Sequence, residues 1–134
     1  MQSATQPVEQ KTLRVLICGS RNWINKRRIG KYLDTLIDDE GYLPENITII
    51  HGACKGADYH AGNEAKGRSM TVEEYPADWK QGFSSGPKRN QRMLDEGKPN
   101  RVVAFHEDIQ NSKGTRDMVA RAKKANVPIE VITN

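Results

Sequence analysis

Two short turns, each placed after an apolar run, carry the residues best suited to hold a phosphate. The first turn is Cys18-Gly19-Ser20-Arg21 and the second is Ser112-Lys113-Gly114-Thr115. A glycine lets the backbone approach a ligand closely, and the free N–H groups at the start of a helix attract anions. Arg21 and Lys113 add positive charge, and the Ser20 hydroxyl adds a donor. The two turns therefore predict a pocket for a phosphorylated, nucleotide-like molecule.

A third loop, from His51 to Asp58, also follows an apolar run and precedes a helix. Gly52 and Gly56 allow this loop to fold tightly over a ligand, and Lys55 lies between them. Asp58 has two alternative roles. It can cap the helix and complement its dipole, or its carboxylate can accept hydrogen bonds from sugar hydroxyls. We include this loop in the predicted binding site.

A basic helix is expected from Pro87 to Glu96, since proline suits a first helical turn. Lys88, Arg89 and Arg92 fall on about two turns of it. Arg89 and Asn90 are placed to point from the helix start into a cleft. The alternative is a solvated basic face, which is the commoner outcome for such a cluster.

The histidines and cysteines form no recognisable catalytic or metal motif. None of the three histidines belongs to a pattern typical of a nucleophilic triad. Cys18, His51, Cys54 and His60 match none of the usual zinc spacings, so we predict no metal site and no cofactor. Two cysteines do not make a disulfide framework, and we expect both as free thiols.

These candidate residues are separated by an uninterrupted alternation of strand and helix patterns. A helix is expected from about Lys26, capped by Asn25 and ended by Gly41, and another from Ala57 to Gly67. The basic helix and a helix after the Ser112 turn complete the set. The expected strands are Leu13–Cys18, Ile47–His51, Met70–Tyr75, Arg101–Phe105 and Val127–Ile132.

Five strands alternating with four helices predict an α/β fold, a Rossmann-like doubly wound parallel sheet of order 3-2-1-4-5. The more polar third strand is expected at an edge. In this order, strands one and four are neighbours at the point where the connection reverses. Ligands bind at such switch points, beyond the carboxyl ends of the strands, so both phosphate-binding turns are expected there.

Composition indicates one domain, residues 13–134, after a flexible N-terminal tail of residues 1–12. The 134 residues are 36% hydrophobic, and the mean hydropathy is −0.77. No apolar run approaches the roughly 18 residues of a membrane span, and the polar N-terminus does not resemble a signal peptide. We therefore expect a cytoplasmic protein without a membrane partner. The net charge of +4 favours anionic partners in general.

Five linked motifs resemble the YspA/YpsA-related branch of the SLOG superfamily, over about Leu13 to Ile132. The superfamily is named for the DNA-processing protein DprA and the LOG enzymes. The resemblance implies a Rossmann-like fold that binds nucleotides, nucleotide-derived signals or nucleic acid, and homo-oligomers are common. In chain order, the motifs are Ile17-Cys18-Gly19-Ser20-Arg21, His51-Gly52-Ala53-Cys54-Lys55-Gly56-Ala57-Asp58, Tyr75-Pro76-Ala77-Asp78-Trp79, Gly86-Pro87-Lys88-Arg89-Asn90 and Ser112-Lys113-Gly114-Thr115-Arg116-Asp117-Met118.

LOG enzymes are phosphoribohydrolases, which cleave the base from a nucleoside 5′-monophosphate. Arg89 is similar in position to their helix-start arginine, and Gly114-Thr115 resembles their phosphate-binding Gly-Thr pair. Their glutamate is replaced here by Met118, while Asp117 comes one residue earlier and is shorter. Glycosidic cleavage needs a carboxylate to stabilise the oxocarbenium-like state or to activate water. Arg89 and Asp117 are therefore the candidate catalytic residues.

Three functions are open at this point. The first is a sensor or sequestering protein that binds a nucleotide-derived ligand without turnover. The second is a phosphoribohydrolase-type nucleotide hydrolase with Asp117 or Asp58 as base. The third and least favoured is a nucleic-acid module, because acidic residues interrupt the basic ones. The predicted ligand-binding residues are Gly19, Ser20, Arg21, Gly52, Lys55, Gly56, Asp58, Asn90, Ser112, Lys113, Gly114 and Thr115.

A homodimer or higher homo-oligomer is also expected. Trp79 and Phe83 fall on a loop, where exposed aromatic side chains suit an interface. This expectation rests partly on the resemblance.

Overall fold

Five parallel strands form one sheet of order β3-β2-β1-β4-β5 in the computed structural model, which describes residues 11–134. This order confirms the predicted Rossmann-like topology. Residues 1–10 of the expected tail lie outside the described residues. The strands are β1 (Leu13–Gly19), β2 (Ile47–His51), β3 (Thr71–Glu74), β4 (Arg101–Phe105) and β5 (Ile129–Ile132).

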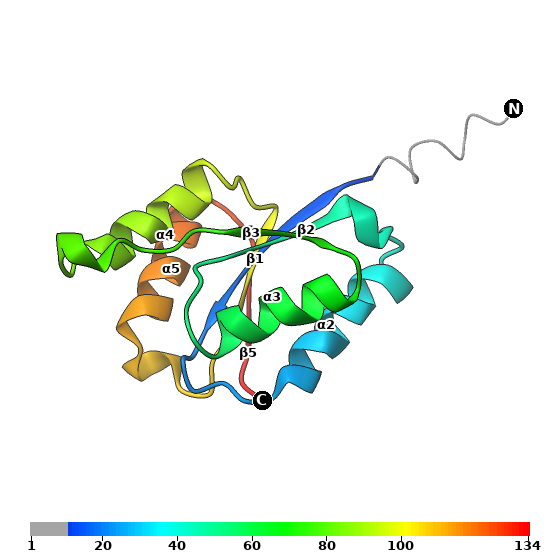
Figure 1. Cartoon of the computed structure of the whole chain (residues 1–134), viewed down its shortest axis with the longest axis horizontal. Helices are drawn as coiled ribbons and strands as arrows, with labels where there is room; N and C mark the ends of the chain where they lie inside the picture. The colour runs from blue at the N-terminus through cyan, green and yellow to red at the C-terminus, as the bar shows by residue number, and fades with distance from the viewer. Residues whose placement is uncertain (1–10) are drawn as a thin grey trace, which may run out of the picture.

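Helices cover both faces of the sheet. α2 (Lys26–Asp38) and α3 (Ala57–Gly67) pack on one face, and α4 (Ser85–Asp95) and α5 (Lys113–Lys124) pack on the other (Figure 1). Three short 3₁₀ helices lie in the connections: η2 (Pro44–Asn46), η3 (Trp79–Gln81) and η4 (Ile109–Asn111). No helix among residues 11–134 has the length and apolar character needed to span a membrane.

β1 is central and contributes to both layers of the core. Val15 and Ile17 join the cluster beneath α2 and α3, while Leu16 and Cys18 join the cluster beneath α4 and α5. Alternate residues of a strand point to opposite faces, so a strand covered on both sides reads as a continuous apolar run. β3 lacks such an apolar run, and its residues are exposed or half-buried. This agrees with its position at one edge of the sheet.

Some element ends differ from the sequence-based expectation. α2 begins at Lys26 with its Asn25 cap as predicted, and the cap accepts a hydrogen bond from the Arg28 N–H over 3.2 Å. It ends at Asp38, before Gly41. α4 begins at Ser85, two residues before Pro87. Proline is tolerated there because the first N–H groups of a helix have no intrahelical acceptor.

Candidate functional site

A cavity of about 550 Å³ opens at the carboxyl end of β1, beside the starts of α4 and α5. Because β1 and β4 are neighbours, the segments that follow them meet at this edge of the sheet. The cavity brings together most of the residues predicted to bind or act on a ligand. Those that line it are Gly19, Ser20, Arg21, Asp58, Arg89, Asn90, Ser112, Lys113, Gly114, Thr115 and Asp117.

The start of α5 forms one wall. Ser112 caps the helix, and its hydroxyl oxygen accepts a hydrogen bond from the Thr115 N–H over 3.1 Å. Lys113 and Gly114 lie at the first turn, where N–H groups have no acceptor within the helix. The positive end of the helix dipole and the Lys113 ammonium therefore add to each other at this wall.

The turn after β1 forms a second wall. The Ser20 hydroxyl donates to Glu107 over 2.6 Å and accepts from the Asn22 N–H over 2.9 Å. That bond from Ser20 lowers the pKa of the Glu107 carboxyl. The Ser20 hydroxyl hydrogen is therefore already engaged in a hydrogen bond with Glu107 in this structure. Arg21 is exposed, and its Cζ lies 6.0 Å from the centre of the Trp79 ring.

Three predicted binding residues, Gly52, Lys55 and Gly56, do not line the cavity. Gly56 has a φ of +75°, which glycine adopts readily, and it packs against the backbone of Ser20 and Arg21. Gly52 lies against the Arg89 guanidinium, which would collide with any Cβ atom. Both glycines thus support residues that line the cavity: Gly56 supports the Ser20 turn and Gly52 supports Arg89. Lys55 is exposed and lies outside the cavity lining.

Arg89 is a buried cation at the cavity. Its side chain is 8% exposed, and it donates to the Gly52 carbonyl oxygen over 2.5 Å, to the Tyr75 carbonyl oxygen over 3.4 Å and to Asn90 Oδ1 over 3.0 Å. No Asp or Glu oxygen within residues 11–134 comes within 4 Å of its nitrogens. The guanidinium charge acts on the buried groups beside it, because it works to lower the pKa values of Asp58 and Cys18.

Asp58 is the buried carboxyl group of the cavity. It is 5% exposed and accepts hydrogen bonds from the N–H groups of Gly52, over 2.8 Å, and Cys54. Burial raises the pKa of Asp58 to about 6, although these bonds and the Arg89 charge act in the opposite direction. The carboxyl therefore changes charge just below neutral pH.

Asp117 has a different environment. Its Oδ2 accepts hydrogen bonds from Asn90 Nδ2 over 2.9 Å and from Arg121 Nε over 2.8 Å. The bond to Asn90 joins α5 to α4, and Arg89 donates to the same amide from the other side. The carboxylate of Asp117 thus orients Asn90 and is paired with a cation. Met118, at the position of the LOG glutamate, is fully buried in the core and does not line the cavity.

Several cavity residues were not predicted as binding residues. His106 follows β4 directly, and its place at the end of that strand predicts contact with the site; its Nδ1 accepts from the Asp108 N–H over 2.9 Å. Both cysteines also line the cavity. The sulfur of Cys54 lies 3.7 Å from Arg89 Nη2. Burial raises the pKa of the Cys18 thiol. The other unpredicted residues of the lining are Trp79, Phe83, Gly86, Pro87 and Met93. Among residues 11–134, no group of three or more potential ligand side chains is placed to hold a metal ion.

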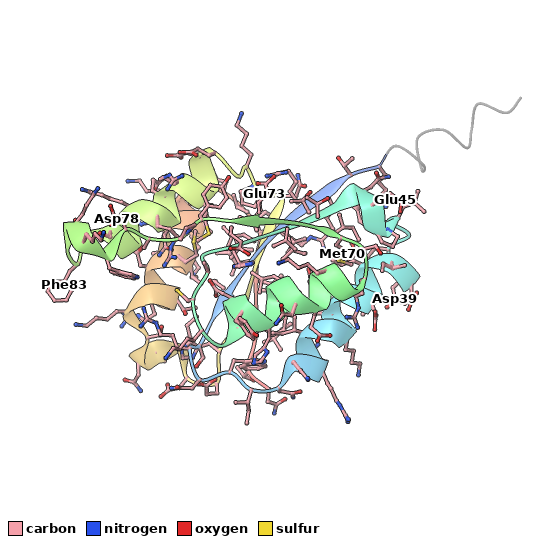
Figure 2. The ribbon with its side chains drawn as sticks, viewed as in Figure 1. Asp39, Glu45, Met70, Glu73, Asp78 and Phe83 are labelled. Carbon is pink, nitrogen blue, oxygen red and sulfur yellow. The ribbon has the colours of Figure 1, made fainter. Side chains whose placement is uncertain are left out.

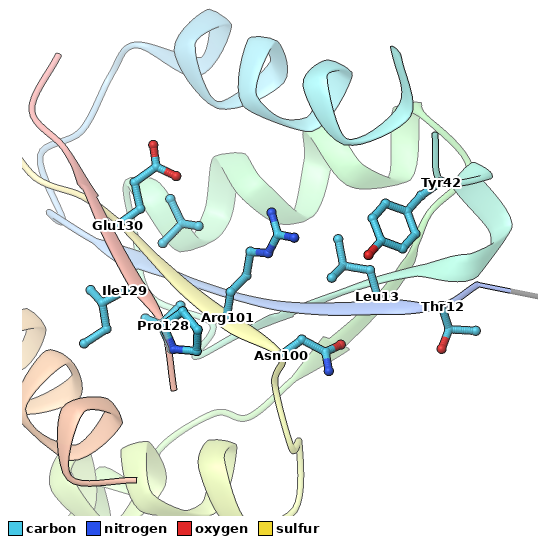
Figure 3. A pocket seen from close by; sticks show the side chains of 10 residues that line it. Thr12, Leu13, Tyr42, Asn100, Arg101, Pro128, Ile129 and Glu130 are labelled. Atoms are coloured by element: carbon cyan, nitrogen blue, oxygen red, sulfur yellow. The ribbon is translucent and has the colours of Figure 1, made fainter. Parts of the chain in front are cut away.

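A second cavity, of about 500 Å³, lies near the amino ends of β1 and β4 (Figure 3). Its main charged group is Arg101, whose guanidinium donates to both Glu40 oxygens over 2.9 and 3.0 Å. Since this cation is already neutralised and none of the predicted binding residues lies there, the cavity at the carboxyl ends is the better candidate site.

Known proteins resemble this chain in sequence and in fold. Residues 13–82 match the sequence model of the family described as "YspA, cpYpsA-related SLOG family". The Gene 61 protein of Mycobacterium phage D29 is 34% identical over 122 residues, which cover 87% of this chain and 93% of the phage protein.

Two solved structures share the fold at 16% sequence identity. DNA processing protein A (DprA) from Streptococcus pneumoniae has a TM-score of 0.63 over 93% of this chain, which spans about half (51%) of the DprA chain. The Moco Carrier Protein from Chlamydomonas reinhardtii has a TM-score of 0.57 over 92% of this chain and 77% of its own. At this identity, the likenesses show the fold alone. The family match and the phage relative show that this chain belongs to the YspA, cpYpsA-related SLOG family.

Proposed function

We propose that the protein binds a nucleotide or a nucleotide-derived phosphorylated ligand in the cavity at the carboxyl end of β1, as a sensor or sequestering protein. The observation that carries the proposal is the meeting of two cationic features in one cavity. The start of α5 provides N–H groups and Lys113, and Arg89 provides a buried guanidinium that, among residues 11–134, has no carboxylate oxygen within 4 Å of its nitrogens. The volume of about 550 Å³ falls within the usual range for small-molecule sites.

The structural neighbours support binding in a general way. By name, one is a DNA processing protein and the other is a carrier of Moco. The fold therefore serves proteins that handle nucleic acid or a small molecule. In open α/β sheets, such ligands bind at the switch point that this cavity occupies.

A second candidate function is nucleotide hydrolysis of the phosphoribohydrolase type. One observation favours Asp58 over Asp117 as its acid–base group. Asp117 is paired with Arg121, whereas Asp58 lies in the cavity near Arg89 with a pKa raised to about 6, close to what general acid–base catalysis requires. Since Asp58 also holds the Gly52 loop, we rank binding without turnover first.

Nucleic-acid binding has less support. The candidate basic side chains are Lys88, Arg89, Arg92, Arg116, Arg121, Lys123 and Lys124. Arg89 is buried, and Arg92 and Arg121 are paired with Glu96 and Asp117. The remaining charges are too few for the continuous basic surface that electrostatic binding to a nucleic acid requires.

A cytoplasmic location and a homodimer or higher homo-oligomer complete the proposal. Sedimentation over a range of concentrations tests the oligomer, and a monomer throughout would refute it.

Native mass spectrometry of the full-length protein tests the proposed function. The protein is examined as purified and after mixing with a panel of nucleoside mono-, di- and triphosphates. We expect a retained or added nucleotide-sized mass and no free base after incubation. Release of base would favour the hydrolase, and the absence of any bound mass across the panel would overturn the proposal.

A further inference from the structure

Two large aromatic side chains that line the cavity are exposed to solvent. Trp79 in η3 is 52% exposed, and Phe83 in the loop that follows is 98% exposed. Figure 2 shows Phe83 pointing outward at the end of the molecule where η3 joins α4. Single exposed hydrophobic residues are ordinary, but two aromatic rings at one cavity indicate a contact that the isolated chain does not satisfy.

The loop that carries them is braced by its own hydrogen bonds. The Ser85 hydroxyl donates to the Asp78 carbonyl oxygen over 2.5 Å and so joins the two ends of the loop. The Asp78 carboxylate accepts from the Lys80 N–H over 3.2 Å and from the Gln81 amide over 3.1 Å. Phe83 takes no part in this bracing. The loop therefore holds its shape without the Phe83 side chain, and the Phe83 ring is free to contact a ligand.

The Trp79 ring is held at the start of α4. A Cβ atom on Gly86 would lie 3.0 Å from the edge of this ring, so the ring rests directly on the helix backbone. Arg21, from the turn after β1, has its Cζ 6.0 Å from the centre of the same ring. Arg21 lines the same cavity as the aromatic residues and the cationic start of α5, so it can contact a ligand that touches both.

The lining of the cavity consequently combines two kinds of chemistry. The start of α5 suits an anion, whereas Trp79 and Phe83, with Pro87 and Met93 in the same lining, suit a flat apolar ring. Aromatic side chains hold nucleobases by stacking, and they do so for every base because each has a π face. A molecule that carries both a phosphate and a planar heterocycle matches both groups of lining residues.

We propose that Trp79 and Phe83 form the base-binding end of the site, so that the ligand keeps its nucleobase when bound. This inference rests on the proposed function. It adds that affinity depends on the base and that a sugar phosphate without a base is a poor ligand. The two aromatic residues are specificity-determining, while the start of α5 and Arg21 recognise the phosphate.

The test compares AMP, CMP and ribose 5-phosphate by calorimetry on the full-length protein and on Phe83→Ala. Removal of the ring is expected to weaken AMP and CMP by about 5- to 100-fold and to leave ribose 5-phosphate nearly unchanged. Phe83 suits this test because its exposed side chain contributes little to folding. Phe83→Tyr keeps a stacking ring and is expected to restore nucleotide affinity. The matched control is Tyr59→Ala, an aromatic residue 60% exposed on α3 outside the cavity lining.

The outcomes separate this inference from the proposed function. Equal losses for the nucleotides and ribose 5-phosphate, or no loss at all in Phe83→Ala, would overturn the base-binding role while the nucleotide site stands. A change in sedimentation of Phe83→Ala with unchanged nucleotide affinity would also overturn it and would assign the ring to contact between copies of the chain. If the unmodified protein binds neither nucleotide, this inference is overturned, whereas the proposed function is decided by the wider panel of nucleoside mono-, di- and triphosphates.

Discussion

The Arg89 guanidinium donates to the carbonyl oxygen of Gly52 over 2.5 Å and thereby ties the start of α4 to the end of β2. Asp58 accepts the N–H of the same glycine over 2.8 Å. Gly52 is thus held by a cation through its oxygen and by a carboxyl group through its nitrogen. Arg89 and Asp58 both line the cavity, whereas Gly52 does not. The positions of the two charged groups in the cavity therefore depend on Gly52.

Gly52→Ala is expected to destabilise the protein by about 1–3 kcal/mol, because the added methyl group collides with the Arg89 side chain. Urea unfolding measures the change. The control is Gly67→Ala at the end of α3, where a Cβ atom meets nothing within 4 Å and where alanine is a better helix former. Equal stability of the two variants would show that the guanidinium moves aside without penalty.

Arg21→Ala and Lys113→Ala are expected to weaken the binding of a nucleotide by about 1.5–3 kcal/mol each, as for other hydrogen bonds to charged groups. The corresponding uncharged nucleoside should lose much less, because it offers no phosphate. Calorimetry with both ligands measures the difference. Lys124→Ala, at the far end of α5, controls for the loss of one positive charge. Similar losses for nucleotide and nucleoside would remove phosphate recognition from these side chains.

Asp58 is expected to make stability depend on pH. Its pKa is about 6 in the folded protein against 3.8 for an ordinary aspartate, so the folded state holds the proton more tightly. The resulting stabilisation is complete below pH 3.8, decreases as the pH rises through 6, and is on the order of 3 kcal/mol in total. Urea unfolding of the unmodified protein and of Asp58→Asn, each at pH 4 to 7, isolates this contribution. A difference between the two that stays constant with pH would contradict the raised pKa.

Met118→Glu is expected to destabilise the protein without creating a phosphoribohydrolase. The resemblance to LOG enzymes assigns their glutamate to position 118, but the side chain of Met118 lies in the core beneath α5. A carboxylate there would lose its hydration without gaining a partner. Thermal unfolding and an assay for free base measure the two effects, and Met118→Leu is the control of similar volume. Stable Met118→Glu protein that releases base would show that the side chain reaches the cavity.

The order of the strands and the edge at which the turns meet were determined by the sequence. Apolar runs and helical stripes alternate without a break, and right-handed crossovers bring the ends of parallel strands to one edge. The Ser112 turn could therefore be placed next to the Gly19 turn although 93 residues separate them (112 − 19). The cap of α2 at Asn25 was equally predictable, because capping depends on a few neighbouring residues.

The roles of individual side chains depend on the tertiary structure. The contact between Arg89 and Gly52, the burial of Asp58 and the hydrogen bond from Asn90 to Asp117 all arise from packing between elements, which the pattern of residue types does not report. Trp79 and Phe83 reach the cavity because their loop closes through Ser85 and Asp78. Residue periodicity records which side of an element faces the core, whereas side-chain contacts depend on how those elements pack in space.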